Sequence, residues 1–165
     1  MLTPCTADQE QLILLTPMKL PSMKSPEYVI ILADDDLDDQ LILKEIFSMH
    51  SDTVKILNVL NGEETLHLLE RLQNKDILPC LVILDINMPK LNGRQTLLRL
   101  RQDDRLKNIP VVLFSTSNNA TDKAFAQVHG ANYVTKPFTY KSMEVVVKEF
   151  IRLCEKEGAR RSTAN

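Results

Sequence analysis

The stretch that decides the fold starts at residue 28 and reads YVIILADD. Its apolar part, 28–33, leads directly into the acids Asp34 and Asp35. A second apolar run, 81–84, ends in the same way at Asp85. Short continuous runs of Val, Ile and Leu are typical of strands buried in a parallel sheet. We therefore predict two buried strands, each with carboxylates at its carboxyl end.

Two further apolar runs end in polar residues of other kinds. Residues 111–114 precede Ser115, and the short run 133–135 precedes Lys136 and Pro137. In a parallel α/β sheet the carboxyl ends of the strands meet at one crevice, so these side chains are expected to join the acids there. Carboxylates, a hydroxyl and an ammonium together predict a site for a divalent cation and a phosphoryl group.

Segments with helical spacing alternate with the strands. The expected strands cover residues 28–33, 54–60, 81–84, 111–115 and 133–135. The expected helices cover residues 37–50, 63–73, 94–101, 121–128 and 140–156. Strict alternation of this kind predicts an α/β fold, in which a parallel sheet is covered by helices on both faces.

One domain accounts for most of the 165 residues. Residues 1–25 contain scattered Pro, Thr and Ser and are expected to form an irregular N-terminal extension. The domain is expected over 26–157, followed by a frayed, disordered tail at 158–165. Because so few residues follow the last helix, we expect a stand-alone domain without a separate output domain.

Composition limits the partners and the compartment. With 20 basic and 22 acidic residues the net charge is −2, so no electrostatic footprint for nucleic acid is present. The longest apolar runs are too short to cross a membrane. Cys5, Cys80 and Cys154 are widely spaced without a CxxC pair, which predicts reduced cytoplasmic thiols rather than disulfides or a zinc site. The histidines lack the spacing of metal ligands and are interpreted as surface or partly packed residues.

Mg²⁺ is the cation that suits the clustered acids, because it is a hard ion that binds one or two carboxylates together with phosphate. Asp35 and Asp85 are the candidate direct ligands, with Asp34 acting through water. The alternative for adjacent acids is capping of the following helix, which we expect of Asp36. Asp85 is harder to explain in that way, because its charge directly follows an apolar run.

Ser115 and Lys136 each have an ordinary interpretation as well. A hydroxyl at a strand end often bonds the next turn, and a single lysine more often lies on the surface. Pro137 restricts the backbone of the residue before it, so Lys136 is held extended and its ammonium is presented rigidly. The specificity of the pattern comes from the whole set, in order, at successive strand ends.

On these residues the stretch 28–156 resembles the receiver domain of two-component response regulators, the CheY-like fold. The matching segments are ILADD at 31–35, LDINMP at 84–89 with Gly93, PVVLFS at 110–115 and GANYVTKPF at 130–138. The resemblance implies a doubly wound, flavodoxin-like sheet of five parallel strands in the order 2-1-3-4-5, with helices on both faces.

The resemblance also implies roles for the acids. Asp85 is expected to be the phosphoacceptor, which receives a phosphoryl group from a sensor histidine kinase or a phosphotransfer protein as 4-aspartylphosphate. Asp34, Asp35, Asp85 and the main-chain carbonyl of Asn87 are expected to hold Mg²⁺. A loose phosphoryl-transfer transition state needs positioning and charge neutralisation more than covalent help, and this set supplies both.

The remaining residues of the pattern are expected to form a switch. Ser115 and Lys136 are expected to bind the phosphoryl oxygens, and Tyr133 matches the family's aromatic switch position. When Ser115 moves toward the phosphate, Tyr133 is expected to swing inward and remodel the face of the fourth helix, fifth strand and fifth helix. The alternative for Tyr133 is a half-buried strand aromatic. Thr116 is bulkier than the Ala or Gly common after the switch hydroxyl, which puts the phosphoryl lifetime in question.

The resemblance therefore predicts a bacterial, cytoplasmic phosphorelay protein that signals through that face, as a monomer or a phosphorylation-dependent homodimer. No enzymatic activity is expected beyond its own phosphoryl transfer and slow self-dephosphorylation. One alternative is a small phosphatase with an Asp nucleophile and Mg²⁺, but the haloacid dehalogenase pattern requires a second acid where this chain has Asn87. Another is a pseudo-receiver without phosphorylation, which the complete acid set disfavours.

Overall fold

The computed structural model describes residues 28–163, in which five strands alternate with five helices. The strands are β1 (Tyr28–Ala33), β2 (Val54–Val59), β3 (Leu81–Asp85), β4 (Val111–Ser115) and β5 (Asn132–Thr135). The helices are α1 (Leu37–His50), α2 (Gly62–Gln73), α3 (Gly93–Gln102), α4 (Ala120–Val128) and α5 (Tyr140–Thr163). The predicted α/β class is confirmed. The predicted irregular extension at 1–25 lies outside the described residues.

The strands form one parallel sheet in the order β2-β1-β3-β4-β5, which confirms the predicted order. The direction of winding reverses between the neighbours β1 and β3, and ligands of doubly wound sheets bind at such a point. In the register of these two strands Ala33 lies opposite Leu84. Asp34 and Asp85, which follow directly, are therefore brought to the same edge of the sheet.

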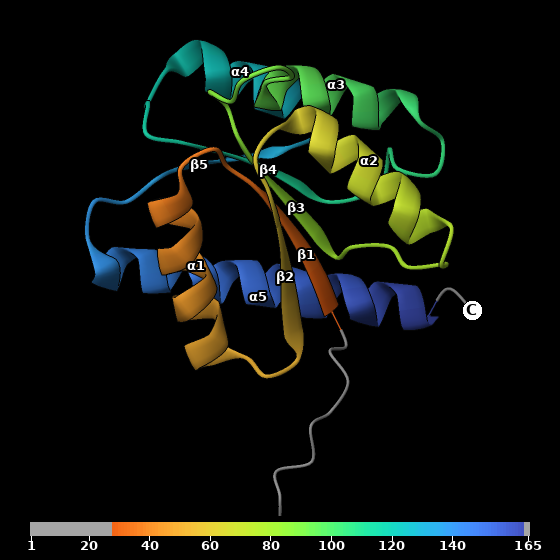
Figure 1. Cartoon of the computed structure of the whole chain (residues 1–165), viewed down its shortest axis with the longest axis horizontal. Helices are drawn as coiled ribbons and strands as arrows, with labels where there is room; N and C mark the ends of the chain where they lie inside the picture. Colours follow the sequence, from red (N-terminus) through yellow and green to blue (C-terminus); the bar gives the residue numbers. More distant parts are fainter. Residues whose placement is uncertain (1–27, 164–165) are drawn as a thin grey trace, which may run out of the picture.

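Helices cover both faces of the sheet (Figure 1). Helices α1 and α5 lie on one face, and α2, α3 and α4 lie on the other. Side chains of β1 alternate between the two cores because successive residues of a strand point to opposite faces. Ile30 and Leu32 join the α1/α5 core, whereas Ile31 and Ala33 join the other core. The central strands β3 and β4 are thus buried on both sides along their whole length, as their continuous apolar sequences predict, whereas the edge strands β2 and β5 keep half-buried and exposed positions.

Helix α5 continues to Thr163. The prediction of a disordered tail at 158–165 is therefore wrong for residues 158–163. Gly158 lies within the helix, where a Cβ would come within 2.4 Å of the Tyr28 ring. The guanidinium of Arg161 donates hydrogen bonds to the main-chain oxygens of Leu78 and Pro79, both at 3.0 Å. These contacts with distant segments hold the last turns in place, and sequence periodicity does not reveal them.

Cys80 and Cys154 form a disulfide, which corrects the prediction of reduced thiols for this pair. Cys80 directly precedes β3 and Cys154 lies on α5, and both face the α1/α5 core. They are 74 residues apart in the sequence. Their spacing therefore carried no signal, because only the packing of α5 on the sheet brings them together. Cys5 lies outside the described residues.

The helices are amphipathic rather than apolar throughout. The longest, α5, buries one stripe of side chains at Met143, Val147, Phe150, Ile151 and Cys154. Within residues 28–163, no helix combines the length and the apolar character that crossing a bilayer requires.

Candidate functional site

Three carboxylates meet at the carboxyl ends of β1 and β3. Asp34 is 1% exposed and Asp85 is 7% exposed, whereas Asp35 faces solvent. One carboxylate oxygen from each of the three lies within 4.8 Å of the others. In the described part of the chain this is the only such group of three metal-ligating side chains. The structure thus brings together the acids that the sequence singled out, because β1 and β3 are hydrogen-bonded neighbours.

The buried ammonium of Lys136 lies among these acids. Its Nζ is 2.6 Å from Oδ2 of Asp34, 2.9 Å from Oδ2 of Asp39 and 3.4 Å from Oδ1 of Asp85. The main-chain N–H of Lys136 donates to the carbonyl oxygen of Ser115 at 2.7 Å, which fixes the end of β5 against β4. One cation therefore neutralises charge from β1, α1 and β3 at once.

Two residues of α1 complete the site, and sequence reasoning missed both. Asp39 lies in the first turn of α1, where an acid favours the helix dipole, and its carboxylate also accepts a hydrogen bond from Lys136. Gln40 is buried, and its Nε2 donates to the main-chain oxygens of Asp34 at 2.6 Å and Val59 at 2.9 Å. A glutamine among the buried positions of an amphipathic helix was the available signal, since buried amides need partners.

Burial shapes the electrostatics of the cluster. Desolvation raises the pKa values of Asp34 and Asp85 above their ordinary range, and the charge and hydrogen bonds of Lys136 only partly offset it. Burial by itself lowers the pKa of Lys136, but the hydrogen bonds to Asp34 and Asp39 and the nearby charges raise it overall. A desolvated, electron-rich cluster of this kind is stabilised by additional positive charge.

The loop after β3 supports Asp85 from the other side. The main-chain N–H of Asn87 donates to Oδ2 of Asp85 at 2.9 Å. Gly93, at the start of α3, approaches so closely that a Cβ there would lie 2.2 Å from the carbonyl oxygen of Asp85. The predicted site residue Asn87 is therefore at the cluster, and Gly93 is required for the close return of the loop.

Ser115 and Tyr133 are linked through one residue of the loop after β4. Ser115 is fully buried, and its Oγ accepts a hydrogen bond from the N–H of Ser117 at 3.2 Å. The hydroxyl of Tyr133 donates to the carbonyl oxygen of Ser117 at 2.5 Å. Tyr133 is half-buried, and the ammonium of Lys123 lies 5.9 Å from its ring centre. The two predicted switch residues thus hold the same short segment of backbone.

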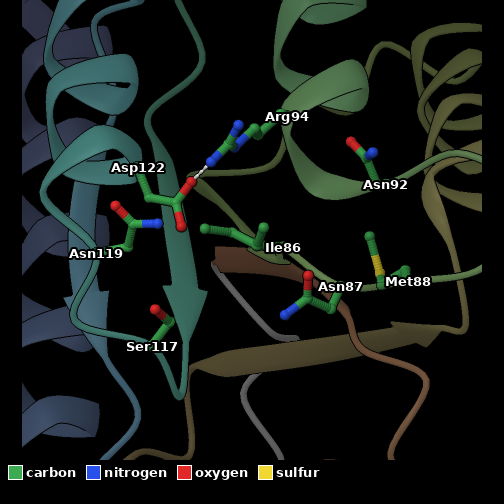
Figure 2. Close-up of a pocket in the computed structure, with 8 residues that line it drawn as sticks. All are labelled: Ile86, Asn87, Met88, Asn92, Arg94, Ser117, Asn119 and Asp122. Carbon is green, nitrogen blue, oxygen red and sulfur yellow. Dashed lines mark ion pairs between the residues drawn. The ribbon is translucent and has the colours of Figure 1, made fainter.

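A pocket of about 660 Å³ opens beside this cluster, between the loops that follow β3 and β4 (Figure 2). Asn87 and Ser117 line it together with residues from the first turns of α3 and α4. The histidines contribute to none of these features: His50 pairs with Glu144, and the ring of His129 packs against Phe125.

Comparison with known proteins identifies the family. A family model, the response regulator receiver domain, matches residues 30–148. The chain belongs to this family. Receiver domains are signalling modules of two-component systems, and their acidic pocket binds Mg²⁺.

Relatives share the receiver domain over most of this chain. It is 29% identical to the response regulator Rcp1 of Synechocystis sp., over 75% of this chain and 86% of Rcp1. It is 31% identical to the sensor histidine kinase CheAY of Helicobacter pylori, over 80% of this chain but 16% of CheAY. The receiver fold also matches the phosphorylated cyanobacterial phytochrome response regulator RcpA, with a TM-score of 0.69 and 29% identity, covering 75% of this chain and 91% of that one.

Proposed function

We propose that this chain accepts a phosphoryl group on Asp85 from a sensor histidine kinase or a phosphotransfer protein and signals by protein contact. The observation that supports this most strongly is the position of the Lys136 ammonium, which contacts Asp34, Asp39 and Asp85 at one end of the sheet. A phosphoryl group on Asp85 brings further negative charge beside a cation that is already in place. Neutralisation by preorganised charge is the main contribution of proteins to phosphoryl transfer.

Mg²⁺ fits the donor set around Asp85. Asp34, Asp35 and Asp85 supply carboxylate oxygens, and the main-chain carbonyl of Asn87 is the fourth proposed ligand. When bound, Mg²⁺ supplies charge that relieves repulsion between the acids and stabilises the phosphoryl oxygens. A Mn²⁺-bound form of Rcp1 is among the similar structures, with a TM-score of 0.65 and 28% identity, covering 74% of this chain and 90% of that one.

In the proposed transfer, a carboxylate oxygen of Asp85 attacks the phosphorus of a phosphohistidine. The new P–O bond gives an acyl phosphate while the P–N bond breaks, and the leaving imidazole nitrogen takes up a proton. Lys136 and the hydroxyl of Ser115 bind the phosphoryl oxygens. Since Ser115 also binds Ser117, its movement shifts the loop that Tyr133 contacts and so changes the face of α4, β5 and α5.

That face is the proposed binding site for the downstream protein, in the cytoplasm and without direct contact to nucleic acid. The proposed receiver unit spans residues 26–157, acts as a monomer or a phosphorylation-dependent homodimer, and has no enzymatic turnover of other substrates.

The test is phosphorylation by a small acyl phosphate with Mg²⁺, followed by intact-protein mass spectrometry. We expect the wild-type chain to gain one phosphoryl group and Asp85→Asn to gain none, because an amide is a poor nucleophile. Asp52→Asn, at an exposed acid remote from the cluster, is the matched control and retains acceptance. An unmodified wild type contradicts the proposal, as does sustained hydrolysis of an aryl phosphate, which indicates a phosphatase.

A further inference from the structure

An ion pair crosses the pocket beside the acid cluster. The guanidinium of Arg94, in the first turn of α3, contacts the carboxylate of Asp122, in the first turn of α4 (Figure 2). The Asp122 side chain is 7% exposed, whereas that of Arg94 is 37% exposed. The pair joins the two helices that follow the strands carrying Asp85 and Ser115. It therefore links the elements that carry the phosphoacceptor and the switch hydroxyl.

Helix α4 has few other attachments to the core. Its buried residues are Asp122 and Ala126, so one of its two buried side chains is charged. Phe125 is partly buried, and the guanidinium carbon of Arg94 lies 5.5 Å from its ring centre. A buried carboxylate is stable only with a partner, and a cation above an aromatic face adds attraction. Arg94 thus holds α4 through two side chains one turn apart.

The start of α4 is connected to the switch residues by a short loop. Asn119 caps the helix by accepting the N–H of Thr121 at 2.8 Å. Ser117, two residues earlier, binds the hydroxyls of both Ser115 and Tyr133. A movement of Ser115 that carries Ser117 with it must also displace the first turn of α4, where Asp122 lies.

We propose that Arg94 is a positioning residue that latches α4 through Asp122 and Phe125 and so opposes the switch. This inference rests on the proposed function. It states that the Arg94–Asp122 pair holds the signalling face of α4, β5 and α5 in its unphosphorylated position. The latch is a coupling between two sites: phosphorylation at Asp85 proceeds more readily when α4 is free to move, and a free α4 is favoured by phosphorylation.

Removal of either partner releases α4, but not equally. In Arg94→Gln the carboxylate of Asp122 stays buried without its counter-ion, which drives the first turn of α4 outward. In Asp122→Asn the guanidinium of Arg94 reaches water, because it is already partly exposed. Both variants are therefore expected to loosen α4, Arg94→Gln more strongly.

A competing explanation is that Arg94 only attracts anionic phosphoryl donors into the pocket. That effect depends on net charge, so Arg94→Gln slows phosphorylation and Asp122→Asn accelerates it. The latch instead predicts the same sign for both substitutions. The signs of the two rate changes distinguish the explanations.

The experiment measures phosphorylation rates with a small acyl phosphate and Mg²⁺ by mass spectrometry, and amide hydrogen exchange across residues 120–128. We expect phosphorylation to accelerate in both single variants, about fivefold in Arg94→Gln and less in Asp122→Asn, with faster exchange in α4 in both. The charge exchange Arg94→Asp with Asp122→Arg is expected to return the rate to within about twofold of wild type. Arg99→Gln, at an exposed position of α3, is the control and leaves both readouts unchanged.

Opposite signs in the single variants overturn the latch in favour of charge attraction. Faster hydrogen exchange in α4 without any change of the phosphorylation rate overturns the coupling. Failure of the double variant Arg94→Asp with Asp122→Arg to restore the phosphorylation rate overturns it as well. If the wild-type chain takes up no phosphoryl group, the proposed function fails instead. Hydrogen exchange then still decides whether Arg94 holds α4, because that readout needs no phosphorylation.

Discussion

Replacement of Lys136 by methionine should destabilise the protein in a manner that depends on pH. The substitution keeps a long, unbranched side chain but removes the cation that contacts Asp34, Asp39 and Asp85 at 2.6, 2.9 and 3.4 Å. Two of these carboxylates are almost fully buried, so water cannot replace the ammonium. Removal of one partner of a buried ion pair lowers the free energy of unfolding by about 3–5 kcal/mol. We expect a loss in this range for Lys136→Met at about pH 8.

The pH dependence follows from the direction of the pKa shifts. Burial raises the pKa values of Asp34 and Asp85 in the folded protein. At pH values between the unfolded-state and the folded-state pKa of each group, the native state therefore binds more protons than the unfolded state. Stability from these groups is complete below their unfolded-state pKa and is lost as pH rises through the folded-state pKa. Without Lys136 both folded-state pKa values are higher still. The deficit of the variant should therefore shrink on acidification to about pH 5.

Urea unfolding of wild type and Lys136→Met at about pH 5 and about pH 8, followed by circular dichroism, measures this deficit. Lys148→Met, at an exposed position of α5, is the control for loss of a lysine. Mg²⁺ at a concentration of a hundred times its Kd should raise the free energy of unfolding of the variant by about 2.7 kcal/mol. A deficit of equal size at both pH values, or none at all, would refute the reasoning that Lys136 compensates buried carboxylates.

Other expectations concern the surrounding framework. Cys80→Ala with Cys154→Ala should lower the unfolding free energy by about 4–5 kcal/mol, because the disulfide closes a loop with a sequence separation of 74, and reductant should lower the wild-type urea midpoint similarly. Gly93→Ala should displace the loop beside Asp85 and weaken Mg²⁺ binding in calorimetry, and an unchanged affinity would contradict the close approach. Gln40→Leu removes the side-chain donor to the carbonyls of Asp34 and Val59, of which Val59 still accepts the N–H of Asp34 at 3.1 Å, and should cost about 1–3 kcal/mol in urea unfolding, whereas a neutral effect would show that water takes over.

Much of the fold was predictable because its signals are local. Continuous apolar runs identified the strands, and their alternation with helices identified the α/β class. Helix ends were less certain: α5 continues to Thr163 because Arg161 and Gly158 contact segments far away in the sequence. The cysteine prediction failed for the same reason, since a disulfide depends on two positions being close in space and not on a spacing motif.

The site was predictable in its residue types and incomplete in its contacts. Asp34, Asp35 and Asp85 were expected together because the carboxyl ends of parallel strands share one edge. Asp39 and Gln40 were missed as site residues, since their roles depend on which face of α1 turns toward β1.

The sequence by itself determined which chemical groups stand at the strand ends and in what order, because strand formation and the polar residue that follows are properties of short segments. Only the tertiary structure decided how those groups are partnered. Lys136 bridges three elements, and Arg94 reaches across a pocket to Asp122. Such contacts depend on helix rotation and loop path, which arise from packing of the whole domain and are encoded in no single stretch of the chain.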